Sequence, residues 1–168
     1  MPTEPWLSGP VEGVPPLLQP VAHGILDAAE QIRSAIEGLS GAELTSRPAG
    51  VASIAFHVRH AAGSLDRLFT YARGEELSEK QRGELAREKA ADDSAVRAAA
   101  LIDIFEDSVA RALAQLRSTD ESALLEKRTV GRMKLPSTTL GLLFHGAEHS
   151  SRHAGQVVTT SKLVRSSV

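Results

Sequence analysis

The sequence contains no cysteine and no long apolar run, and both absences exclude classes of protein. Without cysteine among its 168 residues, the chain has no disulfide, no thiolate metal ligand and no cysteine nucleophile of its own. Its apolar runs are far shorter than the roughly 20 residues of a membrane-spanning helix. The N-terminal MPTEPWLSGP also lacks the basic start and apolar stretch of a signal peptide. We therefore expect a cytoplasmic protein that does not associate with membranes.

An excess of positive charge is also missing. Lys and Arg together number 19 and Asp and Glu 21, which gives a net charge of −2 with neutral histidines. Proteins that bind nucleic acid usually carry a basic surface, so no nucleic-acid partner is expected. The apolar fraction of 42% and the charged fraction of 24% are typical of a globular protein. A chain of this length is expected to form one domain with a sizeable core.

Four long segments carry apolar residues at helical spacing. The first opens at Pro15 and Pro16 and reaches about Gly41, and the others cover about 52–73, 94–116 and 138–163, with Ser94 as a candidate N-cap. Residues 1–16 contain five prolines and two glycines, which predicts an extended arm before a single helical domain over 17–168. Residues 77–92 read as a connection with a short exposed helix, and TVGRMKLP as a short extended or hairpin piece. The pattern predicts an all-α helix bundle.

Five of the six histidines fall into two short windows. LFHGAEHSSRHAGQVV places His145, His149 and His153 four residues apart on one side of the last helix, and FHVRH places His57 and His60 on the second. Side chains four apart on a helix are neighbours, so two imidazoles can converge on one metal ion. A third ligand from another helix, with coordination positions left open, is typical of a catalytic or ligand-binding site. The alternative is a set of core histidines hydrogen-bonded to backbone or water.

The choice of ligands is open at this stage. Helical angles place His57 nearer the apolar stripe of the second helix and His60 towards its flank, but metal sites often lie at an edge of a core. The rise of about 6 Å over four residues prevents one straight helix from wrapping three ligands around an ion, so His145 is expected beside the site. Glu148 and Arg152 are expected to pair at its rim, and His23 to be an ordinary polar or packed histidine.

Two segments together resemble the DinB/YfiT-like superfamily. HGAEHSSRHAGQ resembles the family's last helix, with H-x-x-x-H followed by a Gly-Gln pair, and SIAFHVRHAAGSLDRL resembles its second-helix ligand segment, in which Ile54, His60, Ala61 and Ala62 match. The resemblance covers the chain from about Leu17 to Leu163. It implies a four-helix up-down-down-up bundle and a divalent ion held by His60, His149 and His153. The family pattern does not require His57 and His145, which are therefore the second choice as ligands.

The resemblance also implies a class of function. Members with known activity are thiol-dependent transferases and isomerases, and members are often homodimers. We expect a metal-dependent transferase that activates a small-molecule thiol for attack on an electrophilic substrate, because a +2 ion bound by neutral imidazoles favours a thiolate. His57, His145, Glu148 or Gln156 are candidates to orient the reacting groups. Nitrogen ligands suit zinc or nickel best, with iron and copper possible.

Three other functions compete with a transferase. A non-catalytic metal-binding or small-ligand-binding protein of a stress response would have the same ligands. A metal-dependent hydrolase would need a carboxylate base, and Glu148, the acidic residue in the histidine window, points away from His153 on a helical wheel. A structural bundle with packed histidines would gain no stability from a metal ion.

Overall fold

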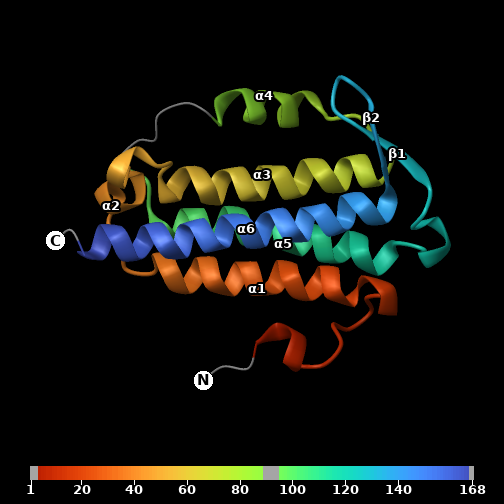
Figure 1. Ribbon diagram of the computed structural model, residues 1–168, viewed down its shortest axis with the longest axis horizontal. Coiled ribbons are helices and arrows are strands. Elements are labelled where there is room, and N and C mark those ends of the chain that lie inside the picture. The colour runs from red at the N-terminus through yellow and green to blue at the C-terminus, as the bar shows by residue number, and fades with distance from the viewer. Residues whose placement is uncertain (1–3, 89–94, 167–168) are drawn as a thin grey trace.

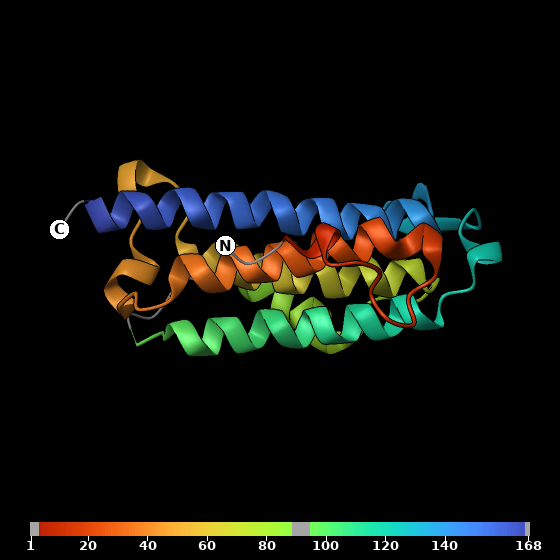
Figure 2. The ribbon, with the colours of Figure 1, turned by 90° about the horizontal axis from the view of Figure 1, so that it is seen from below.

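The protein, as a computed structural model, is mostly helical, and the structure describes residues 4–88 and 95–166. Four long helices in this part of the chain lie side by side along the molecule: α1 (Gln19–Ile36), α3 (Ile54–Ala72), α5 (Ala98–Ser118) and α6 (Thr139–Ser166) (Figure 1). α6 packs against both α1 and α3, and α5 packs against the same two helices from the other side (Figure 2). The colours of Figure 1 show that α1 and α6 run in one direction along the molecule, and that α3 and α5 run in the opposite direction.

The core lies between these helices and consists of the apolar stripes that the sequence pattern predicts. In α3 the apolar stripe is almost completely buried, whereas Leu68 on the same helix is partly exposed. The boundaries of this helix follow from local chemistry. The Ser53 hydroxyl accepts a hydrogen bond from the Phe56 amide at its start, and Gly74, with φ +79°, follows its end. The largest fully buried side chains come from all four long helices, from the turn before α1 and from the segment before α3: Leu18, Ile25, Ile32, Ile36, Leu44, Ile54, Val58, Leu65, Leu101, Phe105, Leu116 and Leu143.

The first helix ends earlier than the sequence suggested. α1 stops at Ile36 rather than near Gly41, because Glu37 leaves the helical conformation and Gly38 has φ +76°. A separate short helix, α2 (Gly41–Thr45), then begins at Ser40, whose hydroxyl accepts from the Glu43 amide while the Glu43 carboxylate accepts from the Ser40 amide. This capping box starts a new helix within a few residues of the end of α1.

The connection between α3 and α5 contains the exposed helix that was expected, α4 (Glu79–Arg87). Ser78 and Gln81 cap its start reciprocally, and none of its residues is buried. Figure 1 shows α4 lying alongside α3, outside the four long helices. α5 begins at Ala98, and Ser94, the expected N-cap, lies outside the described residues.

A small antiparallel sheet precedes α6, in addition to the helices of the predicted all-α class. β1 (Lys127–Val130) pairs with β2 (Leu135–Thr138), with Lys127 opposite Thr138 and Val130 opposite Leu135. The segment TVGRMKLP indicated this hairpin, and Gly131 adopts φ +68° in its turn. The helical class itself is confirmed.

The N-terminal segment lies beside α1, and the α1 side chains Gln19 and His23 hydrogen-bond to it. Gln19 accepts a hydrogen bond from the Val11 amide at 2.7 Å, and its amide group donates to the Val14 carbonyl at 2.8 Å. The segment contains 3-10 turns at Pro5–Leu7 and Pro16–Leu18, and the second of these leads directly into α1. The division into an arm over 1–16 and a domain over 17–168 stays a prediction. Over residues 4–88 and 95–166, no helix combines the length and apolar character needed to span a bilayer.

Candidate metal centre

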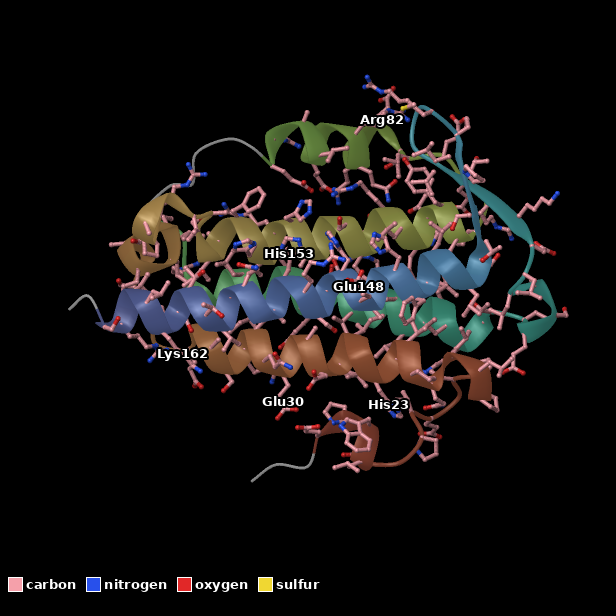
Figure 3. The ribbon with its side chains drawn as sticks, in the orientation of Figure 1. His23, Glu30, Arg82, Glu148, His153 and Lys162 are labelled. Atoms are coloured by element: carbon pink, nitrogen blue, oxygen red, sulfur yellow. The ribbon has the colours of Figure 1, made fainter. Side chains whose placement is uncertain are left out.

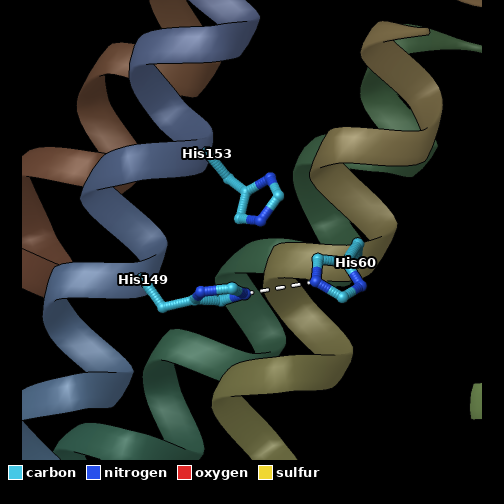
Figure 4. Close-up of side chains that lie close together, drawn as sticks. All are labelled: His60, His149 and His153. Atoms are coloured by element: carbon cyan, nitrogen blue, oxygen red, sulfur yellow. Dashed lines mark hydrogen bonds between the residues drawn. The ribbon is translucent and has the colours of Figure 1, made fainter. Parts of the chain in front are cut away.

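Histidines from α3 and α6 meet where these two helices pack together. One nitrogen atom each of His60, His149 and His153 lies within 4.8 Å of the other two, and this is the group of possible metal ligands that the described residues contain. His60 Nε2 and His149 Nε2 are 3.2 Å apart. Figure 4 shows the His149 and His153 rings projecting from α6 towards the His60 ring on α3 (Figure 4). The geometry therefore brings together the same three side chains that the family resemblance singled out.

Close packing of α3 and α6 makes this meeting possible. Gly146, one turn before His149, is buried against α3, and a Cβ atom there would lie 2.9 Å from Phe69 Cε2 and 3.2 Å from Leu65 Cδ1. The absence of a side chain at Gly146 lets the helix axes approach. The four-residue spacing then brings His149 and His153 of α6 together edge to face, with their ring centroids 4.5 Å apart and the ring planes at 67°.

His57 and His145 lie beside this group. His57 is buried, with 8% of its surface exposed, and its Nδ1 forms a 3.0 Å hydrogen bond with His153 Nδ1. His145 is exposed and hydrogen-bonds to Glu148 at 3.1 Å, one turn away from His149 on the same helix. The nitrogen atoms of these two histidines are not part of the three-histidine group.

The rim of the site agrees with the sequence predictions. Glu148 forms an ion pair with Arg152, and both side chains are partly exposed on α6. Figure 3 shows Glu148 nearer the start of α6 than His153, and His23 on the side of α1 that faces the N-terminal segment (Figure 3). His23 forms a 3.0 Å hydrogen bond with the Gly9 carbonyl, so it is the ordinary polar histidine that was expected.

The outer nitrogen atoms of the three rings have different surroundings. His60 Nδ1 lies 2.8 Å from the Glu88 carboxylate, and the His60 ring stacks on Phe56 with a 5.5 Å centroid distance. His153 contacts His57 through Nδ1. His149 Nδ1 is buried and has no hydrogen-bond partner in the part of the chain that the structure describes.

The electrostatic environment lowers the pKa of His149 and of His153 and so keeps these two rings neutral at pH 7. Burial, together with the charges of His60 and His145, lowers the pKa of His149 from 6.5 to about 4. Burial and the neighbouring histidines His149 and His60 lower the pKa of His153 to about 3. Burial also lowers the pKa of His57. Neutral imidazole is the form that binds a metal ion, so at neutral pH no proton has to leave these rings before binding.

The Glu88 carboxyl group, in contrast to these uncharged rings, remains ionised. Burial raises the pKa of its carboxyl group, but hydrogen bonds from His60 and Arg67 and the positive charge of Arg67 outweigh this effect, so the pKa lies below its usual value. The carboxylate is therefore an acceptor for His60 Nδ1–H, which leaves the lone pair of His60 on Nε2, towards His149.

These residues fit a divalent metal ion. Two nitrogen atoms that each bind zinc at about 2.05 Å with tetrahedral geometry are about 3.3 Å apart. The 3.2 Å separation of His60 Nε2 and His149 Nε2 matches this distance. A neutral three-nitrogen donor set without thiolate or carboxylate suits zinc, nickel, copper or iron rather than magnesium or calcium.

A large cavity lies next to the three histidines, on the side of α3 that faces α4 and α5. It has a volume of about 850 Å³, and the three histidines do not line it. Phe56 and Glu88 belong to its wall, and both contact His60. The rest of the wall is mostly charged and of mixed sign, with arginines from α3, α4 and α5: Arg59, Arg73, Arg87 and Arg111. The cavity can therefore hold a polar molecule that is separated from His60 by the side chains of Phe56 and Glu88.

Sequence reasoning missed Glu88 and Phe56. Glu88 lies 28 residues after His60 in a charged segment that reads as a solvated connection, and nothing in its local pattern distinguishes it from the neighbouring acidic residues. Phe56 precedes the FHVRH histidines directly, and its four-residue spacing to His60 was the available signal for a ring contact. Arg59, which lies between these histidines in the FHVRH segment, lines the cavity.

Comparison with known proteins agrees with the fold and the motif. A model of the DinB superfamily matches residues 25–157, which is most of the chain. The structure resembles a crystal structure of a conserved protein from Enterococcus faecalis with a TM-score of 0.70 and 21% sequence identity, covering 89% of this chain and 98% of the other. At that identity the likeness shows a common fold. No curated protein matches the sequence significantly. The chain belongs to the DinB superfamily.

Proposed function

We propose that this member of the DinB superfamily binds one divalent metal ion through His60, His149 and His153 and uses it as a metal-dependent transferase of small-molecule thiols. The observation that carries the proposal is the convergence of three imidazole nitrogens from two helices within 4.8 Å, with the His149 and His153 rings neutral at pH 7. Zinc or nickel is the expected metal, and iron is the next candidate.

The ion would supply positive charge at an open coordination position, which lowers the pKa of a bound thiol towards neutrality. Because the chain has no cysteine, the thiol has to come from a second molecule. The cavity beside the site supports this proposal, because its arginines and carboxylates can hold the polar parts of such a molecule next to Phe56 and Glu88.

Hydrolysis is less well supported than thiol transfer. A hydrolase needs a carboxylate that is free to accept a proton from water. Glu148 pairs with Arg152 and His145, and Glu88 pairs with His60 and Arg67. Both nearby carboxylates are thus engaged as hydrogen-bond acceptors of protein side chains.

The arrangement of the long helices supports an up-down-down-up four-helix bundle for this chain. We infer this topology from the directions of α1, α3, α5 and α6 in Figure 1 and from the family. A homodimeric state and a cytoplasmic location stay predictions from the sequence.

Metal analysis of protein purified without a nickel column tests the metal site. We expect a stoichiometric divalent ion in the wild type, its loss in His60→Ala and His149→Ala, and its retention in His23→Ala, which removes a histidine from α1. Full metal content in the first two variants would contradict the ligand assignment.

Turnover of thiols with a panel of electrophiles tests the activity. Metal-dependent turnover that His149→Ala abolishes is the expected result. Tight binding of metal and thiol without turnover would instead favour a non-catalytic metal-binding or small-ligand-binding protein.

A further inference from the structure

Glu88, at the end of α4, joins two residues of α3 through the two oxygens of one carboxylate. Oε2 lies 2.8 Å from His60 Nδ1, and Oε1 accepts a 2.6 Å hydrogen bond from Arg67 Nη1. Only 11% of the Glu88 side chain and 9% of the Arg67 side chain are exposed. His60 and Arg67 are about two helical turns apart on the same face of α3, so a single carboxylate spans both.

Gly63 leaves the space that this contact needs. It lies between His60 and Arg67 on α3, and a Cβ atom there would come within 2.7 Å of Arg67 Nη1 and 2.8 Å of Glu88 Oε1. A side chain at this position would force the ends of both the Arg67 and Glu88 side chains to move from their present positions. The contact therefore depends on a glycine in the interior of α3, where glycine otherwise costs about 1 kcal/mol of stability relative to alanine.

We propose that Glu88 is a positioning residue of the metal centre, which holds the His60 ring with Nε2 directed at the ion and thereby couples the docking of α4 to metal binding. This inference rests on the proposed metal site. A carboxylate that accepts from the outer nitrogen of a metal-binding histidine fixes the tautomer and the orientation of the ring. Arg67 in turn fixes the carboxylate through a charge-assisted hydrogen bond.

The coupling follows from how little else attaches α4 to the bundle. No residue of α4 is buried, so no apolar side chain anchors it in the core. Its start is tied to α3 by Gln81, whose amide group donates to Asp66 and Thr70 at 2.7 Å each. Its end is tied by Glu88 to the ring of His60. If the Glu88 contact favours metal binding by some factor, bound metal must favour the docked α4 by the same factor.

The wall of the cavity is therefore expected to become more rigid when metal binds. α4 contributes Lys80, Gln81, Glu84 and Arg87 to that wall, and the residues at the two ends of α4, Ser78 and Glu88, also line the cavity. A metal ion at the three histidines would stabilise the cavity in which we expect the polar substrate, before any substrate arrives.

Titration of metal-free protein with Co²⁺, followed by its visible absorption, tests the proposal. We expect Glu88→Ala to weaken Co²⁺ binding about 10-fold to 100-fold, the usual range for loss of such an outer partner. Glu88→Gln keeps the size of the side chain and should lie between Glu88→Ala and wild type. Gly63→Ala should also weaken binding, because the added methyl group displaces the ion pair. Glu84→Gln, which removes a cavity-lining carboxylate from the same helix, should bind Co²⁺ like the wild type.

Hydrogen exchange of the α4 amides provides a second measurement. Co²⁺ should slow exchange over residues 79–87 in the wild type and in Glu84→Gln, and should leave it unchanged in Glu88→Ala. Wild-type affinity in both Glu88 variants would overturn the positioning role while leaving the metal site intact. Failure of the wild-type protein to bind Co²⁺ at all would overturn the proposed function and this inference together.

Discussion

The contact between Gly146 and α3 leads to a quantitative prediction about both stability and metal binding. Replacing Gly146 by alanine inserts a methyl carbon 2.9 Å from Phe69 Cε2 and 3.2 Å from Leu65 Cδ1, and both of these side chains are almost fully buried. Adding a methyl group to a packed interface typically costs about 1–3 kcal/mol. Alanine in place of glycine within a helix contributes about 1 kcal/mol in the other direction. The net effect is expected to be a destabilisation of up to about 2 kcal/mol.

Gly155 provides a matched control on the same helix. It is exposed, and a Cβ atom there would have no neighbour within 4 Å. Gly155→Ala carries the same gain in helix propensity without the steric cost, so it should stabilise the protein by about 1 kcal/mol. The difference in unfolding free energy between the two variants isolates the steric contribution, which we expect to be about 1–3 kcal/mol. Urea denaturation followed by circular dichroism measures this difference.

The same variants test whether helix spacing determines the site. If Gly146→Ala forces α6 away from α3, the 3.2 Å separation of His60 Nε2 and His149 Nε2 must increase, and Co²⁺ affinity should fall. Gly155→Ala should leave affinity unchanged. Equal stability of the two variants, with equal metal affinity, would refute the argument that the small size of Gly146 sets the distance between the helices.

Three further predictions concern stability. Ser53→Ala removes the N-cap of α3 and should cost about 1 kcal/mol in urea denaturation, whereas Ser118→Ala at the exposed end of α5 should change stability by less than about 0.5 kcal/mol. A divalent metal ion at 100 times its dissociation constant should add about 2.7 kcal/mol to the free energy of unfolding and raise the melting temperature by about 5–11 °C. A chelator should remove this gain. An unchanged melting temperature would favour packed histidines without metal. The folded-state pKa values of His149 and His153 lie below the unfolded value of 6.5, so the unfolded chain binds more protons than the folded protein. Protein freed of metal by a chelator should therefore lose stability as the pH falls from about 6.5 towards 4. The loss should be at most about 2 kcal/mol per histidine at pH 5. The His149→Ala/His153→Ala double variant should lose this pH-dependent component, and persistence of the full pH dependence would contradict its assignment to these residues.

The sequence by itself determined the elements that depend on local patterns. Apolar residues at helical spacing located the long helices, and the hairpin before α6 was indicated by its turn residues. Four-residue spacing placed His149 and His153 on one face of α6, and the register of the second-helix motif selected His60 over His57. These features are encoded within a few residues of one another, where helix geometry leaves little freedom.

Only the tertiary structure decided the features that involve residues distant in the chain. The sequence could not reveal that Glu88 reaches His60, because the mostly polar helix before it docks on α3 through hydrogen bonds of Gln81 and Glu88 to residues that are distant in the chain. It could not assign Gly146 to the close approach of α6 and Phe69, nor turn His57 towards His153. Side chains on different helices meet according to helix spacing and rotation in the packed core, and those quantities are set by the sum of many contacts rather than by any local pattern.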